Sequence, residues 1–115
     1  MEAVNFEDFK KLDIRIGKII NAKRIEGSDK LLKLSVDFGS GPSTSSGQVI
    51  RQIIAGIGKF YEPESLINKQ CPFVFNLETK MINGMESQGM ILCVDDGGPV
   101  LLYPDREILP GSIVK

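Results

Sequence analysis

Alternating hydrophobic and polar positions predict two β-strands in the first third of the chain. From Leu12 to Gly17 every second residue is apolar, and after Gly17 the alternation slips, so that Ile19 and Ile20 are adjacent. A glycine at such a slip indicates a bulge or sharp bend, which is how a strand curls around a small barrel. Residues 32–38 alternate without interruption and form the clearest predicted strand.

Four further strands are predicted downstream. Val49–Ile54 is rich in β-branched residues, and Cys71–Leu77 alternates. Met90–Val94 is a continuous apolar run, so we expect a strand buried on both faces. Val100–Tyr103 follows a DDGG turn and gives a last strand. The closing segment, residues 104–115, contains two prolines and a glycine and is predicted to be an extended tail.

Two short helices and one flexible loop complete the predicted elements. Phe6–Lys11 fits a short helix with Asn5 as its N-cap and both phenylalanines facing inward. Pro63–Ile67 fits one or two helical turns, with the proline at the start. The range Gly39–Gly47, GSGPSTSSG, has nothing to bury and is predicted to be a flexible loop.

These elements predict an all-β fold, with residues 1–115 forming one domain. About five short strands and a bend glycine in the first strand favour a small closed barrel over a sandwich. A five-stranded Greek-key barrel with a helix between strands three and four is the OB-fold arrangement. Such barrels bind ligands on one face through loops one–two and four–five. Here those loops are EGSDK (26–30) and NLETKMINGMESQGM (76–90).

The charge distribution favours an anionic partner although the net charge is only −1. Residues 10–33 hold eight basic and three acidic residues, so this segment is +5 and the rest of the chain is −6. A basic face on an acidic body can bind a phosphate backbone selectively. The alternative is that these residues are solvated edges of strands and turns.

Candidate binding residues lie in the 76–90 segment and on strands two and three. Within the segment, Asn76, Lys80 and Ser87 supply hydrogen-bond donors, and Met90 is a soft group able to pack against an unstacked base. The alternative is a tight loop whose methionines plug the end of the barrel. The other half of the site would comprise Lys30, Lys33 and Arg51. We expect these residues to meet on one wall of the barrel.

No catalytic or metal-binding set is evident in the sequence. The chain has no histidine, which removes Ser-His and Cys-His nucleophile pairs. Cys71 and Cys93 lack zinc-site spacing and are expected to be buried free thiols. Asp95 and Asp96 precede two glycines, as in a hairpin turn rather than a general acid–base pair. The sequence therefore predicts a protein that is not an enzyme and needs no cofactor.

No membrane or export segment is predicted. No apolar run approaches the ~18 residues that a membrane-spanning helix needs. The N-terminal stretch MEAVNFEDFKK is broken by charges, unlike a secretory signal. A cytoplasmic location is the expectation.

Four segments resemble one known family. FEDFKKLDIRIGKI, SDKLLKLSVDFG, RQIIAGI and NLETKMINGMESQGMIL are similar to the tRNA-binding domain. This domain occurs as free-standing dimeric tRNA-binding proteins and as the C-terminal domain or β-subunit of methionyl-tRNA synthetase. The resemblance extends from Phe6 to Val114, and the ending PDREILPGSIV resembles the dimeric branch.

The resemblance implies an OB barrel that binds tRNA without catalysis, by the shape of its elbow and with little sequence preference. It also implies homodimerisation through segments flanking the barrel, and a methionyl-tRNA synthetase chain as a partner. The positions that match the family's binding residues are Lys30, Lys33, Arg51, Asn76, Lys80, Ser87 and Met90. Many relatives carry a proline or a second basic residue where this chain has Glu78 and Thr79, which should weaken affinity. Other relatives resemble chaperones, so a peptide- or protein-interaction module on the same fold is the alternative.

Overall fold

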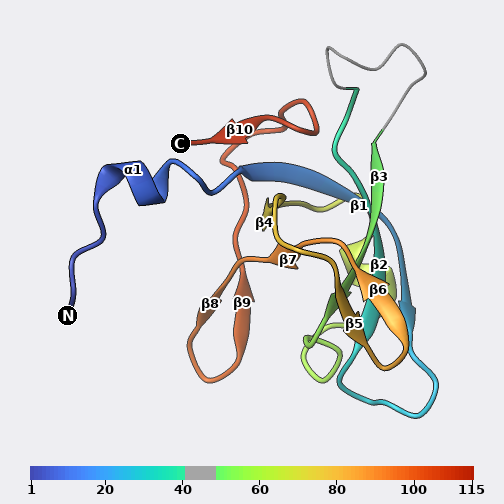
Figure 1. The fold of residues 1–115 in the computed structure, drawn as a ribbon. Helices are drawn as coiled ribbons and strands as arrows, with labels where there is room; N and C mark the ends of the chain where they lie inside the picture. The colour runs from blue at the N-terminus through green and yellow to red at the C-terminus, as the bar shows by residue number, and fades with distance from the viewer. Residues whose placement is uncertain (41–48) are drawn as a thin grey trace.

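A five-stranded antiparallel β-barrel dominates the structure, a computed structural model that describes residues 1–40 and 49–115 (Figure 1). Neighbouring strands follow the order β3-β2-β1-β4-β7 around the barrel. The strands are β1 (Ile14–Arg24), β2 (Leu32–Asp37), β3 (Ile50–Ala55), β4 (Gln70–Val74) and β7 (Met90–Ile91). A short helix, α2 (Pro63–Leu66), connects β3 to β4. The predicted OB-type barrel, with its helix between the third and fourth strands, is confirmed.

The barrel encloses one hydrophobic core. Alternate residues of β2 and β3 point inward, and Leu34 and Ile53 are cross-strand neighbours that are both fully buried. Phe73 of β4 packs edge-on against Phe38, with ring centroids 5.5 Å apart. Leu66 brings α2 onto the same core. Burying each such side chain contributes about 1.5–3 kcal/mol, so this core is the main source of stability.

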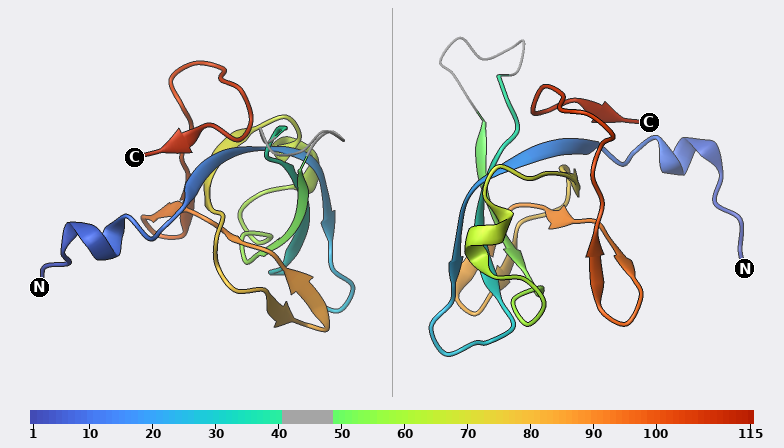
Figure 2. Two further views of the ribbon diagram at one scale, coloured as in Figure 1. Left: turned by 45° about the horizontal axis from the view of Figure 1, so that its top comes forward. Right: turned by 180° about the vertical axis from the view of Figure 1, so that it is seen from behind.

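β1 curls around the barrel at a bulge, which lies three residues later than predicted (Figure 2). The pairing of β1 with β2 shifts register between Ile19 and Asn21, so Ile20 is the extra residue. Gly17 has a different role, because a Cβ there would lie 2.4 Å from Val36. Because glycine has no side chain, the backbone of β1 can pack closely against Val36 at this position.

The N-terminal helix forms, but its phenylalanines do not face the core. α1 spans Phe6–Phe9, and the side chain of Asn5 caps it by accepting a hydrogen bond of 2.8 Å from the backbone N–H of Asp8. The predicted N-cap is confirmed. The prediction that both phenylalanines face inward was wrong. α1 projects away from the barrel (Figure 1), and Phe6 and Phe9 are 68% and 46% exposed.

The predicted four–five loop is a β-hairpin. β5 (Lys80–Ile82) pairs with β6 (Met85–Ser87) in antiparallel register. Asn83 and Gly84 turn the chain with φ angles of +50° and +77°, as a two-residue hairpin loop requires. The hairpin lies beside β3 at the open edge of the barrel.

The apolar run Met90–Val94 is not a single strand buried on both faces, so that prediction was wrong. β7 ends at Ile91, and β8 (Cys93–Asp95) leaves the barrel to pair with β9 (Pro99–Leu101). Met90 and Val94 are both exposed. β7 lies at the edge of the sheet, where β4 is its only partner among the described strands, so the chain is free to depart there.

The tail returns to the barrel as an added strand. β10 (Ile113–Val114) pairs with Ile14 and Arg15 at the start of β1, which agrees with the predicted extended tail. The predicted flexible loop Gly39–Gly47 lies, from residue 41 onward, outside the described residues. In the part of the chain that the structure describes, no helix has the length and apolar character needed to cross a membrane.

Candidate nucleic-acid interface

The barrel closes at a seam between β3 and the segment that follows β6. The backbone N–H of Gln88 donates to the carbonyl of Gln52 at 2.8 Å. Ser87 is 3% exposed, and its Oγ accepts a hydrogen bond of 3.0 Å from the N–H of Ile54 and donates to the carbonyl of Gly89 at 3.1 Å. A Cβ at Gly89 would lie 2.9 Å from the carbonyl oxygen of Val74, so the seam requires glycine there.

A cavity of about 410 Å³ opens beside this seam. We call it the seam hollow, and its lining residues are Ile54, Leu77, Glu78, Lys80, Ile82, Ser87, Gly89 and Met90. Its walls are mainly apolar, while Lys80 and Glu78 bring opposite charges to it. Three of the predicted site residues, Lys80, Ser87 and Met90, therefore meet at one cavity.

Three lysines lie on the outer wall of the barrel next to the seam hollow. Cross-strand neighbours point to the same face of a sheet, and Lys33 is the neighbour of Ile54, which lines the hollow. Lys23 of β1 is the neighbour of Lys33 on its other side. The aliphatic part of Lys30 lies against Gly56, where a Cβ would be 3.3 Å away. We call Lys23, Lys30 and Lys33 the lysine wall.

Arg51 lies at the end of the barrel rather than on the lysine wall. Its cross-strand neighbour is the fully buried Val36, so its side chain points inward. The guanidinium stacks on the ring of Phe75 at 3.6 Å and donates to the carbonyl of Phe75. Burial lowers the pKa of Arg51, the nearby charge of Arg15 lowers it further, and Asp13 partly opposes both effects.

Asn76 joins the N-terminal segment to β4. Its Nδ2 donates to the carbonyl of Lys11 at 2.6 Å, and its Oδ1 accepts from the N–H of Asp13 at 2.8 Å. With Arg51 it lines a second cavity of about 350 Å³, which also includes Leu77 of the seam hollow. The two cavities are therefore adjacent.

The structure gathers most, but not all, of the predicted site on one face. Lys80, Ser87 and Met90 line the seam hollow. Lys33 is the cross-strand neighbour of its lining residue Ile54, and Lys30 lies against Gly56, two residues farther along the chain. Arg51 and Asn76 lie at the adjoining barrel end. Lys23 is one of the basic residues of the 10–33 segment but was not among the predicted site residues. The break in the hydrophobic alternation at Ile19 and Ile20 could have predicted its position. A bulge at Ile20 shifts the alternation by one residue, so that Asn21 and Lys23 point to the outer face.

Comparison with known proteins identifies the family. The model described as "Putative tRNA binding domain" matches residues 14–112. The chain belongs to this tRNA-binding domain family. Over 116 residues, and the whole of this chain, it is 47% identical to a methionine–tRNA ligase of Pyrococcus horikoshii. It is 48% identical over 113 residues, 97% of this chain, to a methionine–tRNA ligase of Methanothrix thermoacetophila. The tRNA-binding domain spans only 15% and 16% of the length of these two ligases.

Solved structures share the fold of this tRNA-binding domain over its full length. A MetRS-related protein from Pyrococcus horikoshii superposes with a TM-score of 0.86 at 34% identity and covers 100% of both chains. The chaperone CsaA from Bacillus anthracis superposes with a TM-score of 0.82 at 33% identity, covering 99% of this chain and 100% of its own.

Proposed function

We propose that this chain is a non-catalytic tRNA-binding module that recognises the elbow of the folded tRNA with little sequence preference. The observation that carries the proposal is the lysine wall beside the seam hollow, in a chain that belongs to the tRNA-binding domain family. Binding of this kind needs charge and shape and requires no nucleophile.

Each group of site residues has its own part in this proposal. Lys30, Lys33 and Lys80 would contact backbone phosphates, and Lys23 extends this set. Met90 would pack against an unstacked base at the seam hollow. The hydrogen bonds of Asn76, Ser87 and Arg51 within the fold suit them to position the surrounding segments. Glu78 would weaken the contact, because a carboxylate repels phosphate.

The partner that would use the bound tRNA is a methionyl-tRNA synthetase chain. Support comes from the methionine–tRNA ligases, which contain a similar segment. A tethered or associated tRNA-binding module raises the effective concentration of tRNA at the catalytic chain. Such a role places the protein in the cytoplasm, as the sequence predicts.

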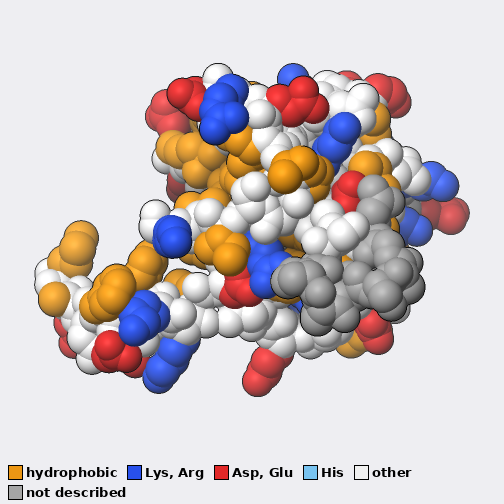
Figure 3. All heavy atoms as spheres, turned by 90° about the horizontal axis from the view of Figure 1, so that it is seen from above, with side chains coloured by type: hydrophobic (Ala, Val, Ile, Leu, Met, Phe, Trp, Pro, Cys, Tyr) orange, Lys and Arg blue, Asp and Glu red, His pale blue; other side chains and the backbone are white. Residues whose placement is uncertain are grey.

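Homodimerisation is a second part of the proposal. An apolar groove of about 540 Å³ lies between the N-terminal segment and the tail. It is lined by Phe6, Phe9, Lys10, Leu12, Ile14, Ile113, Val114 and Lys115. Figure 3 shows apolar side chains along the projecting N-terminal segment. A second copy of the chain would cover these exposed phenylalanines.

A peptide-binding module is the alternative function. The similarity to the chaperone CsaA and the apolar lining of the seam hollow favour it. The two functions differ in what the lysine wall contributes, because an apolar peptide does not need it. Co-purification of salt-releasable tRNA, read from the ratio of absorbance at 260 and 280 nm, supports tRNA binding over peptide binding.

The direct test replaces Lys33 and Lys80 singly with alanine. Each variant should weaken the binding of every tRNA by a similar factor, since a phosphate contact carries no sequence information. Lys11→Ala is the matched control, because Lys11 is an exposed lysine paired with Asp8 away from the site. If Lys33→Ala and Lys80→Ala bind tRNA as the control does, the proposed site is wrong.

A further inference from the structure

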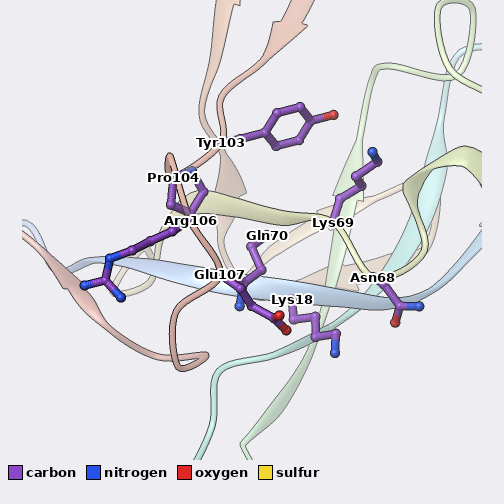
Figure 4. A pocket seen from close by; sticks show the side chains of 8 residues that line it. All are labelled: Lys18, Asn68, Lys69, Gln70, Tyr103, Pro104, Arg106 and Glu107. Atoms are coloured by element: carbon purple, nitrogen blue, oxygen red, sulfur yellow. The ribbon is translucent and has the colours of Figure 1, made fainter.

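A third cavity, of about 550 Å³, lies on a different part of the barrel. We call it the tail hollow, and it is lined by Lys18, Asn68, Lys69, Gln70, Tyr103, Pro104, Arg106 and Glu107. Three chain segments form it: β1, the junction of α2 with β4, and the tail (Figure 4). None of its lining residues belongs to the seam hollow.

Backbone hydrogen bonds hold the three segments of the tail hollow together. The N–H of Ile19 donates to the carbonyl of Lys69 at 2.9 Å, and the N–H of Asn68 donates to the carbonyl of Ile19 at 2.7 Å. The side chain of Gln70 attaches the tail: its Nε2 donates to the carbonyl of Ile108 at 2.6 Å, and its Oε1 accepts from the N–H of Ile108 at 3.0 Å. Because these hydrogen bonds fix the backbone around the tail hollow, binding of a ligand would not carry the entropic cost of ordering it.

The tail hollow carries an excess of positive charge. Lys18, Lys69 and Arg106 oppose one lining acid, Glu107, so the lining is formally +2. None of the ion pairs found among the described residues involves these three basic side chains. Asp37, the cross-strand neighbour of Lys18, reduces the local potential but does not line the hollow.

The side chains suit a phosphate group. The ammonium of Lys69 lies 5.3 Å from the ring centre of Tyr103, which is 53% exposed and offers both a hydroxyl and an aromatic face. Burial is the main cause that raises the pKa of Tyr103 above its ordinary value near 10, and already at that value the hydroxyl is a hydrogen-bond donor at neutral pH. Arg106 lies on the far rim, its guanidinium directed away from Lys69 (Figure 4).

The outer face of β1 connects the tail hollow to the lysine wall. Lys18, Asn21 and Lys23 all point outward. The extra residue Ile20 shifts the alternation of β1 by one position, so residues 18, 21 and 23 share one face. Lys23 follows Lys18 by five positions along the strand, which corresponds to at most roughly 16 Å at about 3.3 Å per residue. One polyanion could therefore contact both basic regions.

We propose that the tail hollow binds a backbone phosphate of the same RNA that lies on the lysine wall. This inference rests on the proposed function and extends the tRNA contact beyond the face that OB barrels ordinarily use. Lys69 supplies positive charge beside Tyr103, which adds a donor and a stacking surface, while Lys18 and the more distant Arg106 add positive charge to the lining. Gln70 is a positioning residue that holds the tail in place.

The test measures the salt dependence of tRNA binding by the full chain. Each lost phosphate contact reduces the slope of log K against log salt by about 0.7–0.9, which makes the loss of affinity between 50 and 200 mM salt about threefold smaller. We expect Lys69→Gln/Arg106→Gln to reduce the slope by at least ~0.7. The control is Lys11→Gln, which removes an exposed lysine that is ion-paired with Asp8 on α1. Glu107→Gln should strengthen binding, a result that local unfolding would not produce.

The outcomes separate this inference from the proposed function. If wild-type protein binds tRNA and Lys33→Ala weakens it, while the Lys69→Gln/Arg106→Gln variant matches its control, the tail hollow is not an RNA site and the proposed function stands. If wild-type protein does not bind tRNA at any salt concentration, both proposals fail. Titration with inorganic phosphate, followed by NMR at the amides of residues 68–70, tests for a free phosphate ligand. Saturation at submillimolar phosphate would overturn the assignment to RNA.

Discussion

At the scale of single residues, Ser87 links the barrel seam to the candidate site. Its hydroxyl oxygen accepts a hydrogen bond from the N–H of Ile54, which a neighbouring strand would otherwise do. The same hydroxyl donates to the carbonyl of Gly89. A buried N–H without a partner costs about 1–3 kcal/mol. Ser87 therefore supports the cavity even if it never contacts a ligand.

We predict that Ser87→Ala lowers the free energy of unfolding by about 1–3 kcal/mol, because Ile54 loses its acceptor. Urea denaturation measures the change. Ser35→Ala is the control, since Ser35 lies on the outer face of β2 and its side chain makes no hydrogen bond among the described residues. Equal stability of Ser87→Ala and wild type would contradict the role of the hydroxyl at the seam.

The two cysteines differ in burial and therefore in the reactivity of their thiols. It raises the pKa of the Cys71 thiol to about 12, and it also raises the pKa of Cys93, which is only half-buried. Since the thiolate is the reactive form, iodoacetamide at pH 8 should label Cys93 before Cys71, and Cys71 only after unfolding. Mass spectrometry of the labelled peptides checks the order. Rapid labelling of Cys71 in the folded protein would show that it is not enclosed in the core.

The raised pKa of Cys71 also predicts how stability depends on pH. The folded state keeps the proton that the unfolded state loses, so this contribution is complete below the unfolded pKa and is lost as pH rises toward 12. We expect Cys71→Ala to lose less stability than wild type between pH 9 and pH 11, as measured by urea denaturation. Parallel stability curves for the two proteins would contradict this expectation.

At the scale of elements, regular alternation of apolar and polar residues predicted the barrel strands correctly, whereas the prediction for the apolar run at the sheet edge was wrong. Residues 32–38 alternate because one face meets the core, and β2 forms there as expected. The run Met90–Val94 is as apolar as a buried strand, yet it divides at the sheet edge, where a single strand pairs with it in the part of the chain that the structure describes. Periodicity reports which side chains are apolar, but not whether a second strand lies beside them. For the same reason the exposure of Phe6 and Phe9 could not be read from their spacing.

The site shows the same limit. The sequence indicated the residue types correctly, but the inward direction of Arg51 follows from its pairing with Val36, a long-range contact that no local pattern encodes. The partners of Asn76 are likewise far away, since Lys11 and Asp13 lie more than 60 positions earlier in the chain.

Asn76 controls how firmly the N-terminal element is attached to the barrel. Asn76→Ala removes both hydrogen bonds to the segment before β1, so residues 5–13 should exchange amide hydrogens faster while the core strands keep their protection. Hydrogen-exchange mass spectrometry measures this difference. Thr79→Ala, a substitution in the same connection, serves as the control. Unchanged exchange in residues 5–13 would mean that α1 is held by other contacts.

At the scale of the whole molecule, the groove between α1 and the tail predicts the oligomeric state. A charge placed at Phe9 or Ile113, both exposed and both lining the groove, should dissociate a dimer. We expect wild-type protein to scatter light with twice the chain mass of 12.7 kDa, and Phe9→Glu with the mass of one chain. Val94→Glu places the same charge on an exposed apolar residue outside the groove and should leave the dimer intact. A wild-type monomer would reject dimerisation.

One measurement tests most directly whether the folded protein recognises a folded tRNA. Gel shifts over a range of salt concentrations compare full-length tRNA, a tRNA minihelix and an unstructured RNA of equal length. If four to six phosphates are contacted, log K for tRNA should fall against log salt with a slope of about −3 to −5, and tRNA should bind far more tightly than the other two RNAs. A slope near zero, or equal binding of the unstructured RNA, would contradict elbow recognition by the basic face.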